Sequence, residues 1–534
     1  MQRFAELYTR LDSTTATNDK VAALKDYFQS APAEDAAWAV HFLVGRRLKR
    51  LVPNARLREW AGEVTGYAPW MIEECYSSVG DLAETVTLLL DAVATGQPGH
   101  DRPLHEWVET RIEPLRKMDE ADQRDAVTGW WRDVPTDQRF VLNKLLTGAF
   151  RVGVAKRLVT RALAEHGGLD TSKVAHRLMG RWIPSGPFFE RLLDPEDHGE
   201  DAAQPYPFFL ASPIEQMAGD AGPVSDWLVE WKWDGIRAQL IRRQGQCHIW
   251  SRGEEPMPGR FPEIEQAAAQ LPDGCVLDGE ILAWKDDAPM PFAQLQRRIG
   301  RLKPSEKLQA QAPVIFQAYD LLEGDGRDLR DDPIEARRSR LTALLDAANA
   351  GPALRISGRV EADSWDRLEA LRAESRERGT EGFILKRAGS PYRVGRKRGD
   401  WWKWKVEPYT VDAVLLYAQP GHGRRSNLLT DYTFGVWDGD EIVPFAKAYS
   451  GLTDKEISEL DRWIRRHTKE RFGPVRSVEL AQVFELAFEG IRSSNRHKSG
   501  IAVRFPRIAR WRRDLAIADA EQLQQIRDML PAGG

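Results

Sequence analysis

The chain has 534 residues, of which 42% are hydrophobic and 29% are charged, and its formal net charge is −4. This composition excludes a largely disordered protein, and the length exceeds what one core usually supports, so we expect about two to four domains. No apolar stretch is long enough to cross a bilayer and the first residues lack the apolar centre of a signal peptide, so we expect a cytoplasmic protein without membrane contact.

The cysteine content excludes two further classes. The three cysteines are Cys75, Cys247 and Cys275, and no two of them form a C-x-x-C pair. They are too few for a four-cysteine zinc site, and their spacing does not suggest a disulfide framework. We therefore expect reduced, mostly buried thiols.

Residues 1–203 have the pattern of an all-α domain. Asp81 stands before apolar residues that recur at helical spacing and is suited to cap a helix. The segment 138–166 continues this spacing, with glycines as interruptions and ends. The stretch 194–205 is acidic and poor in apolar residues, so it is the expected linker to the next domain.

Beyond residue 203 the hydrophobic period changes to that of strands. Short runs rich in β-branched and aromatic residues are separated by glycine and proline, and they include 227–230, 247–250, 314–319 and 382–386. Helical segments lie between them near 334–348 and 361–378. The pattern predicts an α+β domain built on antiparallel sheet over residues 204–408.

Residues 409–534 read as a third domain. Strand-like runs occupy 411–417, 432–437 and 442–449, a turn is expected at Asp438-Gly439-Asp440, and a helix follows over 454–467. Short strands with one helix predict a C-terminal β-barrel of the OB-fold type.

Positive charge is concentrated locally although the net charge is negative. Three basic clusters lie at 46–58, 393–405 and 498–513. Any one of them is more often a solvated face, but three together indicate a polyanionic partner.

The central motif is Glu-x-Lys-x-Asp-Gly-x-Arg, which runs from Glu230 to Arg237. We expect one strand to end at Glu230 and another to start near Arg237, so that Lys232 lies on the turn between them. A lysine attacks phosphorus only as the neutral amine, and nearby cations such as Lys403 and Lys405 favour that form. The alternative interpretation is a surface turn that contains the motif by chance.

Further motifs follow in a fixed order, and they make chance a poor explanation. They are Ser251-Arg252-Gly253, Asp278-Gly279-Glu280, residues 381–386, residues 401–405 and Arg504-Phe505-Pro506-Arg507. This series resembles the nucleotidyltransferase motifs of ATP-dependent DNA ligases and of their relatives, the RNA ligases and mRNA capping enzymes. The resemblance covers nearly the whole chain and implies an enzyme that seals 5′-phosphate/3′-hydroxyl nicks in duplex DNA through a lysyl-AMP and a DNA-adenylate.

The resemblance implies roles for the residues of the first two motifs. Lys232 would be the catalytic nucleophile that takes AMP from ATP, and Glu230 would contact the adenine side. Arg237 and Arg252 would bind phosphate or ribose.

Two glutamates are the implied metal ligands. Glu280 would hold the ribose or a metal ion, and Glu381 would hold a metal ion. Carboxylate and phosphate oxygens suit Mg²⁺, with Mn²⁺ as the alternative. Either glutamate taken alone would more simply be a surface salt bridge.

The remaining nucleotide contacts come from later motifs. Tyr319 stands where the family has an aromatic residue that stacks on adenine; the alternative is a core aromatic. The implied phosphate contacts are Lys386, Lys403, Lys405 and Arg398, with Lys397 as the alternative to Arg398.

The last motif is implied to orient the pyrophosphate leaving group. Its residues are Arg504, Arg507, Arg510, Arg512 and Asp514. Binding of the DNA backbone is the alternative, and both hold if the C-terminal domain swings between steps.

The implied DNA contacts lie in two places. Arg151 and Lys156 resemble parts of the family's helical DNA-binding domain, although a basic helix face is the plainer alternative. Phe292 resembles a phenylalanine that packs into the minor groove at the nick, and a core phenylalanine is the alternative. The expected partner is nicked double-stranded DNA, bound by a monomer.

Two rival functions remain open from the sequence. One is a different acceptor, as in an RNA ligase or a capping guanylyltransferase, and the other is a non-catalytic nick-binding module. The long helical region argues against capping, and intact Lys232, Glu280 and Glu381 argue against the non-catalytic module. DNA repair is the expected pathway, with replication left open.

Overall fold

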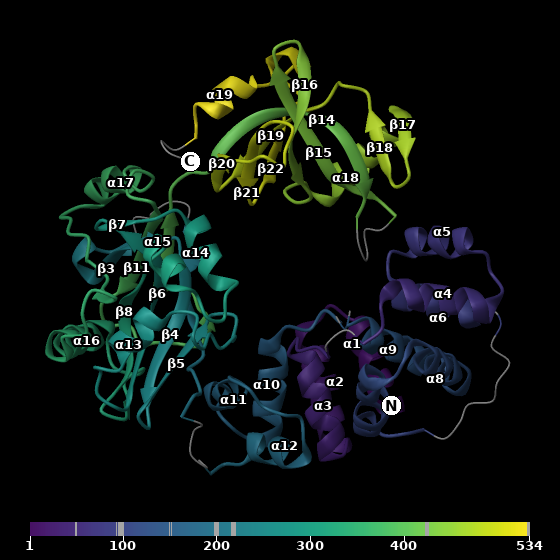
Figure 1. The fold of residues 1–534 in the computed structure, drawn as a ribbon, viewed down its shortest axis with the longest axis horizontal. Coiled ribbons are helices and arrows are strands. Elements are labelled where there is room, and N and C mark those ends of the chain that lie inside the picture. Colours follow the sequence, from purple (N-terminus) through teal and green to yellow (C-terminus); the bar gives the residue numbers. More distant parts are fainter. Residues whose placement is uncertain are drawn as a thin grey trace. The chain divides into compact units, whose positions relative to one another are not determined.

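The computed structural model describes residues 1–48, 51–91, 93, 101–148, 150, 152–196, 202–214, 221–421 and 427–530. The chain divides into two compact units, whose helices and strands are labelled in Figure 1. One unit contains Met1–Thr15, Ala39–Val154 and Glu407–Gly534, and the other contains Ala16–Trp38 and Ala155–Val406.

The first part of the chain is helical, as predicted. Its helices are α1 Gln2–Asp12, α2 Thr17–Ser30, α3 Ala33–Leu43, α4 Asn54–Thr65, α5 Pro69–Val79, α6 Leu82–Asp91, α7 Leu104–Glu106, α8 Glu120–Asp133, α9 Thr136–Thr147, α10 Lys156–Gly167, α11 Thr171–Arg177 and α12 Gly186–Leu193. Asp81 caps α6, because its carboxylate accepts a hydrogen bond from the Glu84 amide at 3.0 Å. Gly148 and Gly168 end α9 and α10 in the left-handed conformation.

Aromatic contacts hold these helices together within each unit. Phe4 of α1 stacks on Phe150 with ring centroids 5.3 Å apart. In the other unit Phe28 of α2 lies 5.9 Å from Phe189 of α12, and Lys25 pairs with Glu165 of α10 at 3.1 Å. Helix α2 therefore packs with α10 and α12 rather than with α1.

The middle of the chain forms two main sheets, and the predicted α+β class is confirmed. The larger has the order β10-β8-β6-β4-β5, from Leu354–Ile356, Val314–Gly324, Cys275–Lys285, Ile236–Arg243 and Gln246–Ser251, with β7 Ala288–Pro289 and β9 Arg327–Asp328 at its margins. The smaller has the order β2-β13-β11-β3, from Ser212–Pro213, Trp401–Lys405, Thr380–Arg387 and Trp227–Trp233. The long pairings are antiparallel, whereas β10 with β8 and β2 with β13 are short parallel pairings.

Helices and a short ribbon complete this region. The helices are α13 Pro262–Ala268, α14 Phe292–Ile299, α15 Glu306–Gln311, α16 Ile334–Ala348 and α17 Trp365–Ala373, and the ribbon pairs β1 Phe209–Leu210 with β12 Gly395–Arg396. Apolar residues of β4, β6, β8, α13 and α16 form the core of the large sheet. A second cluster under the small sheet includes Trp227, Phe383 and Trp404.

Strands β3 and β4 are consecutive in the chain but belong to different sheets. The sharp turn between them is Asp234-Gly235, where a Cβ on Gly235 would overlap the Ile281 carbonyl oxygen and lie 2.8 Å from Glu280 Cγ. The predicted end of the strand at Glu230 is wrong, because β3 continues to Trp233. Lys232 therefore lies within β3 just before the crossing, rather than on the turn.

The C-terminal region is a curled antiparallel sheet of the OB type, as predicted. Its strands are β14 Tyr409–Pro420, β15 Leu429–Asp438, β16 Glu441–Ala448, β17 Thr468–Phe472, β18 Val475–Val478, β19 Val483–Phe488, β20 Gly490–Ser493, β21 Ile501–Arg504 and β22 Arg507–Trp511. The sheet runs β16-β15-β14-β18-β17, and β19 joins β14 to β22. Gly439 and Asp440 form the predicted turn, since Asp438 pairs with Glu441.

Two helices belong to the same region: α18 Asp454–Arg466 and α19 Leu523–Arg527. Thr453 and Glu456 form a capping box at the start of α18. Three residues, Val406–Pro408, connect this region to β13. In the part of the chain that the structure describes, no helix has the length and apolar character needed to cross a membrane.

We predict that Gly451→Ala destabilises the C-terminal region. Gly451 has a φ of 115°, and a Cβ there would overlap the carbonyl oxygen of Ile508. Backbone strain and overlap together should lower the free energy of unfolding by about 3 kcal/mol or more. Gly439→Ala is the control, because its φ of 66° is also left-handed but no atom lies within 4 Å. Chemical denaturation measures both, and equal losses would contradict the steric explanation.

Candidate active site

One face of the small sheet carries the predicted nucleotide residues. Side chains two residues apart on a strand point to the same face, so Glu230 and Lys232 of β3 share a face, as do Lys403 and Lys405 of β13. Between these strands runs β11, where Ile384 lies opposite both Glu230 and Lys403. The register thus brings residues about 170 positions apart in sequence onto one surface.

At one end of this face the Lys232 amine meets the Glu381 carboxylate. Lys232 Nζ lies 2.5 Å from Glu381 Oε2, and Lys405 Nζ lies 3.2 Å from the same oxygen. All three side chains are partly exposed, at 23%, 20% and 31% for Lys232, Glu381 and Lys405. The two ammonium groups hold the pKa of Glu381 at about 2, against the opposing effect of burial.

A glycine makes this contact possible. Gly382 has a φ of 124°, and a Cβ there would overlap the Trp404 carbonyl and lie 2.7 Å from Lys405 Cα. The pairing of β11 with β3 is also irregular between Thr380 and Phe383. Strands β11 and β13 therefore approach closely beside Glu381, next to both lysines.

Lys403 adds a third cation to this end of the face. Burial and the like charges of Lys405 and Lys232 lower the pKa of Lys403. We name Lys232, Lys403 and Lys405 the lysine cluster. Glu381 is the carboxylate that pairs with two of its three ammonium groups. The cluster is therefore suited to bind an anion with several charges, such as a phosphate chain.

Glu280 of β6 approaches the lysine cluster from the large sheet. Burial raises the pKa of Glu280 to about 8, although the charges of Lys232 and Arg237 act in the opposite direction. The neighbouring acids Asp278 and Asp234 raise it further. Glu280 is consequently mostly protonated near neutral pH while no cation is bound.

The other end of the face is built around Glu230, which is buried. Its carboxylate lies 2.6 Å from Arg338 Nη1 and 2.6 Å from Lys386 Nζ. The Lys386 ammonium lies 4.4 Å from the centre of the Tyr319 ring, and burial lowers its pKa. The structure thus places Lys386 with Glu230 and Tyr319, not with the lysine cluster.

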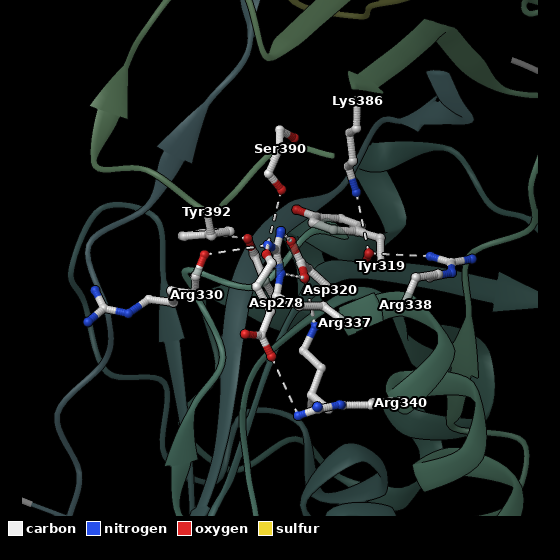
Figure 2. Close-up of polar contacts among 12 residues, drawn as sticks. Asp278, Tyr319, Asp320, Arg330, Arg337, Arg338, Arg340, Lys386, Ser390 and Tyr392 are labelled. Carbon is white, nitrogen blue, oxygen red and sulfur yellow. Dashed lines mark hydrogen bonds and ion pairs between the residues drawn. The ribbon is translucent and has the colours of Figure 1, made fainter. Parts of the chain in front are cut away.

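Behind Tyr319, buried ion pairs fix the strand from which it projects. Arg337 Nε and Nη2 bond both oxygens of Asp320 at 2.8 and 2.9 Å, and both side chains are fully buried. Figure 2 shows Arg338 and Lys386 converging on the Tyr319 main-chain carbonyl, each at 3.3 Å. The aromatic ring is therefore held from its backbone side.

Arg237 lies between the two ends. It bonds Asp278 through Nε at 3.2 Å and Nη2 at 2.7 Å, and Tyr392 also donates to Asp278 at 2.7 Å. Its guanidinium lies 5.7 Å from the centre of the Tyr319 ring. Burial alone would lower the pKa of Arg237, but the nearby Asp278 carboxylate raises it well above its ordinary value.

Three family models match consecutive parts of the chain. They are described as DNA ligase N terminus (residues 1–164), ATP dependent DNA ligase domain (209–405) and ATP dependent DNA ligase C terminal region (425–515). A probable DNA ligase of Koribacter versatilis is 32% identical over 562 residues, which cover 99% of this chain and 96% of the relative. The chain belongs to the ATP-dependent DNA ligase family. It is an enzyme that seals nicks in DNA with ATP.

Further relatives agree with this assignment. A probable DNA ligase of Streptomyces avermitilis is 28% identical and covers 98% of both chains. The solved structure named Pmar-Lig_Pre. has a TM-score of 0.64 at 15% identity, and covers 96% of this ligase and 99% of that chain. At such low identity the structure supports the fold alone.

Several predicted nucleotide residues of the ligase lie outside these contacts. Arg252 is exposed on the loop after β5, and its amide donates to the Arg237 carbonyl at 2.9 Å. Arg398 and the alternative Lys397 are both exposed between β12 and β13. The structure describes all three side chains, and they are exposed to solvent.

The structure describes two of the three residues predicted to contact DNA, and these two lie in different surroundings. Phe292 begins α14 and is partly buried against the core of the large sheet. Lys156 begins α10, where its ammonium pairs with Glu254. Arg151 lies outside the described residues.

The residues of the last motif lie on β21, on β22 and just after β22, and three of its arginines pair with acids. Arg507 pairs with Glu489 at 2.9 Å, and Arg510 pairs with Glu485 at 3.0 Å. Arg512 reaches Asp412 at 2.7 Å and Asp514 at 2.9 Å. Arg504 lies over the ring of Phe505, which is 66% exposed and has a φ of 53°.

Sequence reasoning missed the supporting residues Arg337, Arg338 and Tyr392. A signal for the two arginines was present. They lie three and four residues after Ile334 in α16 and before Leu341, where helical spacing expects the buried face. Charged residues at such positions indicate buried partners.

We predict that Glu280→Gln makes the ligase more stable toward high pH. The folded-state pKa of Glu280 is about 8 against an ordinary 4.5, so the folded protein binds the proton more tightly than the unfolded chain. The wild type therefore loses stability as pH rises from 4.5 to 8, by on the order of 4 kcal/mol relative to the variant. Denaturation at pH 5 and pH 8 in a chelator measures this difference. The control is exposed Glu306→Gln, and an equal pH dependence in wild type and Glu280→Gln would contradict the burial of Glu280.

Proposed function

We propose that Lys232 is the nucleophile of the ligase. Its amine attacks the α-phosphorus of ATP, a phosphorus–nitrogen bond forms, and pyrophosphate leaves with the electrons of the broken phosphorus–oxygen bond. The observation that supports this most directly is the position of Lys232 Nζ, 2.5 Å from Glu381 on a face with two further lysines.

The attacking amine has to lose a proton first. Lys232 donates a hydrogen bond to Glu381 Oε2, which orients the amine. Because the pKa of Glu381 is held at about 2, this carboxylate is a poor proton acceptor and the proton leaves to water. Lys403 and Lys405 then balance the charge on the phosphate oxygens. The resulting lysyl-AMP is neutral at the nitrogen, and its phosphate remains against the lysine cluster.

We assign the adenine base of ATP to the opposite end of the face, around Glu230. Tyr319 would stack on adenine, and Glu230 and Lys386 would contact its edge. Lys386 is thus a base-side residue, because its ammonium lies 2.6 Å from Glu230 and 4.4 Å from the Tyr319 ring centre. Arg237 would contact the ribose or phosphate between the two ends, and Arg252 and Arg398 or Lys397 would reach the nucleotide from the exposed loops.

Glu280 and Glu381 would hold a divalent cation. In the described residues no group of three or more His, Cys, Asp and Glu side chains is arranged to hold a metal ion alone. Mg²⁺ suits such a site, because it usually takes one or two carboxylates and completes its shell with phosphate oxygens and water; Mn²⁺ is the alternative. When bound, the cation neutralises charge on the phosphate oxygens, and Glu280 would ionise to hold it.

The later steps use the DNA. AMP passes from Lys232 to the 5′-phosphate at the nick, and the 3′-hydroxyl then attacks that phosphate and expels AMP. We assign Arg504, Arg507, Arg510, Arg512 and Asp514 to the pyrophosphate in the first step, and Phe292, Arg151 and Lys156 to nicked duplex. The ligase would act as a monomer, with DNA repair as its pathway.

Loss of the Lys232 amine should abolish adenylation. After incubation with ATP and Mg²⁺, intact-protein mass spectrometry should find one added AMP on the wild type, mapped to residue 232, and none on Lys232→Ala. Nick sealing from ATP should fall by about 10⁴-fold or more, because no other group forms the covalent intermediate. Lys455→Ala, an exposed lysine of α18, is the control. AMP on another residue, or labelling by GTP alone, would contradict the proposal.

Glu381→Gln should impair chemistry more than DNA binding. The amide keeps the shape but loses the charge that holds Lys232 and the cation, so the rate of adenylation at saturating ATP should fall by about 100-fold or more. Affinity for nicked DNA should change less than about threefold. Stopped adenylation assays and mobility-shift titrations measure the two quantities, and equal losses would count against a catalytic role.

A further inference from the structure

Arg338 of α16 has no part in the proposed reaction, yet its guanidinium is buried at the base end of the face. The side chain is 8% exposed, although arginine usually keeps its charge in water. Its Nη1 donates to Glu230 Oε1 at 2.6 Å and to the Tyr319 carbonyl at 3.3 Å, and its Nη2 donates to the Ser357 carbonyl. One planar cation thereby fixes groups from three segments, and Figure 2 shows its contact with the Tyr319 carbonyl.

Two of these segments are β3 of the small sheet and β8 of the large sheet, and the segment around Ser357 connects the two sheets. Ser357 donates its amide to the Ala318 carbonyl of β8 at 2.7 Å, and Val360 donates to the Val229 carbonyl of β3 at 2.8 Å. The segment 357–360, which we name the strap, therefore links the large sheet to the small one beside Glu230. Arg338 bonds the strap, β8 and β3 at once.

The contact with Arg338 fixes the orientation of the Glu230 carboxylate, because each of its oxygens has its own partner. Arg338 occupies Oε1, so Oε2 faces Lys386 Nζ at 2.6 Å. The base end thus presents a fixed acceptor, the carboxylate, beside a fixed donor, the ammonium. Adenine matches this order, because its edge carries an amino donor beside a ring-nitrogen acceptor. Guanine carries an oxygen acceptor beside an N–H donor, which is the reverse order.

We propose that Arg338 is a positioning residue that sets the base selectivity of the ligase by holding the Glu230 carboxylate in the orientation that reads adenine. This inference rests on the proposed function of the same face. Without Arg338 the carboxylate is free to turn and pair with Lys386 through both oxygens. The order of acceptor and donor is then lost, so guanine no longer leaves a buried polar group of the pocket unpaired and the pocket discriminates less.

The surroundings of Arg338 allow a clean test. A hollow of 450 Å³, lined by residues that include Ser339, Thr342 and Ser357, lies next to its side chain. Replacement by methionine therefore causes no overlap, and water can reach the vacated polar groups. Arg340 of the same helix is the matched control, because it is 48% exposed and its partner Asp332 lies 3.6 Å away, too far for a hydrogen bond.

The experiment compares Arg338→Met and Arg340→Met with the wild type in lysine adenylation by ATP and by GTP. For Arg338→Met we expect KM for ATP to rise about tenfold or more, since a hydrogen bond to a charged group is lost. We expect kcat to change less than about threefold, and the preference for ATP over GTP in kcat/KM to fall at least about tenfold. Arg340→Met should match the wild type in all three quantities.

A purely structural role predicts a different outcome. In that case kcat and affinity for nicked DNA would fall together while the ATP/GTP preference stays at the wild-type value, and this result would overturn the proposal. If Arg338→Met does not fold, Arg338→Lys serves instead, because it keeps the charge but not the three-way contact. An unchanged preference in a folded variant also overturns the proposal.

A double variant tests whether Arg338 acts through Glu230. If it does, Glu230→Gln together with Arg338→Met should lose no more ATP preference than Glu230→Gln alone, within about twofold. Full additivity would overturn the inference. Absence of AMP on Lys232 in the wild type would instead reject the proposed function, so the two failures are distinguishable.

Discussion

The proposed nucleotide-binding face of this ligase depends on the pairing of charges that the fold removes from water. Glu381 lies between Lys232 and Lys405, and Glu230 lies between Lys386 and Arg338. A buried or half-buried charge is costly unless an opposite charge and hydrogen bonds compensate for it. Each carboxylate therefore requires its cations, and the strands that carry them are constrained to one register. The site is organised before any nucleotide arrives, which reduces the reorganisation that binding demands.

The same register divides the face into two chemical ends. The lysine cluster has excess positive charge and is open to solvent, whereas the surroundings of Glu230 and Lys386 are buried and balanced. A nucleotide has the matching asymmetry, with a charged phosphate chain and a flat base that carries few polar groups. On β3, Glu230 belongs to one end and Lys232 to the other. They are two residues apart, so both side chains project from the same face. Under the proposed function, the face would select the orientation of the nucleotide as well as its identity.

Much of this could be predicted from sequence, and the limits have physical causes. The change in hydrophobic period predicted the helical, α+β and OB-type regions. The motif series predicted most residues of the face, because each motif is a local run on one strand. The end of β3 was misplaced, since Gly235 marks the turn but pairing with β11 carries the strand on to Trp233. Partners such as Arg338 arise from contacts across 108 residues of chain, which no local pattern specifies. Likewise, the placement of Lys386 at the base end follows from its burial against Tyr319 and Glu230, and spacing alone does not fix it.

The short connection after β13 has a mechanical consequence. Val406–Pro408 are all that separate Lys405 from the first strand of the C-terminal region, and the Val406 amide is anchored on the Glu381 carbonyl at 3.2 Å. A tether of this length spans only about 14 Å when fully stretched. The tether therefore limits how far the first strand of the C-terminal region can move from Lys405.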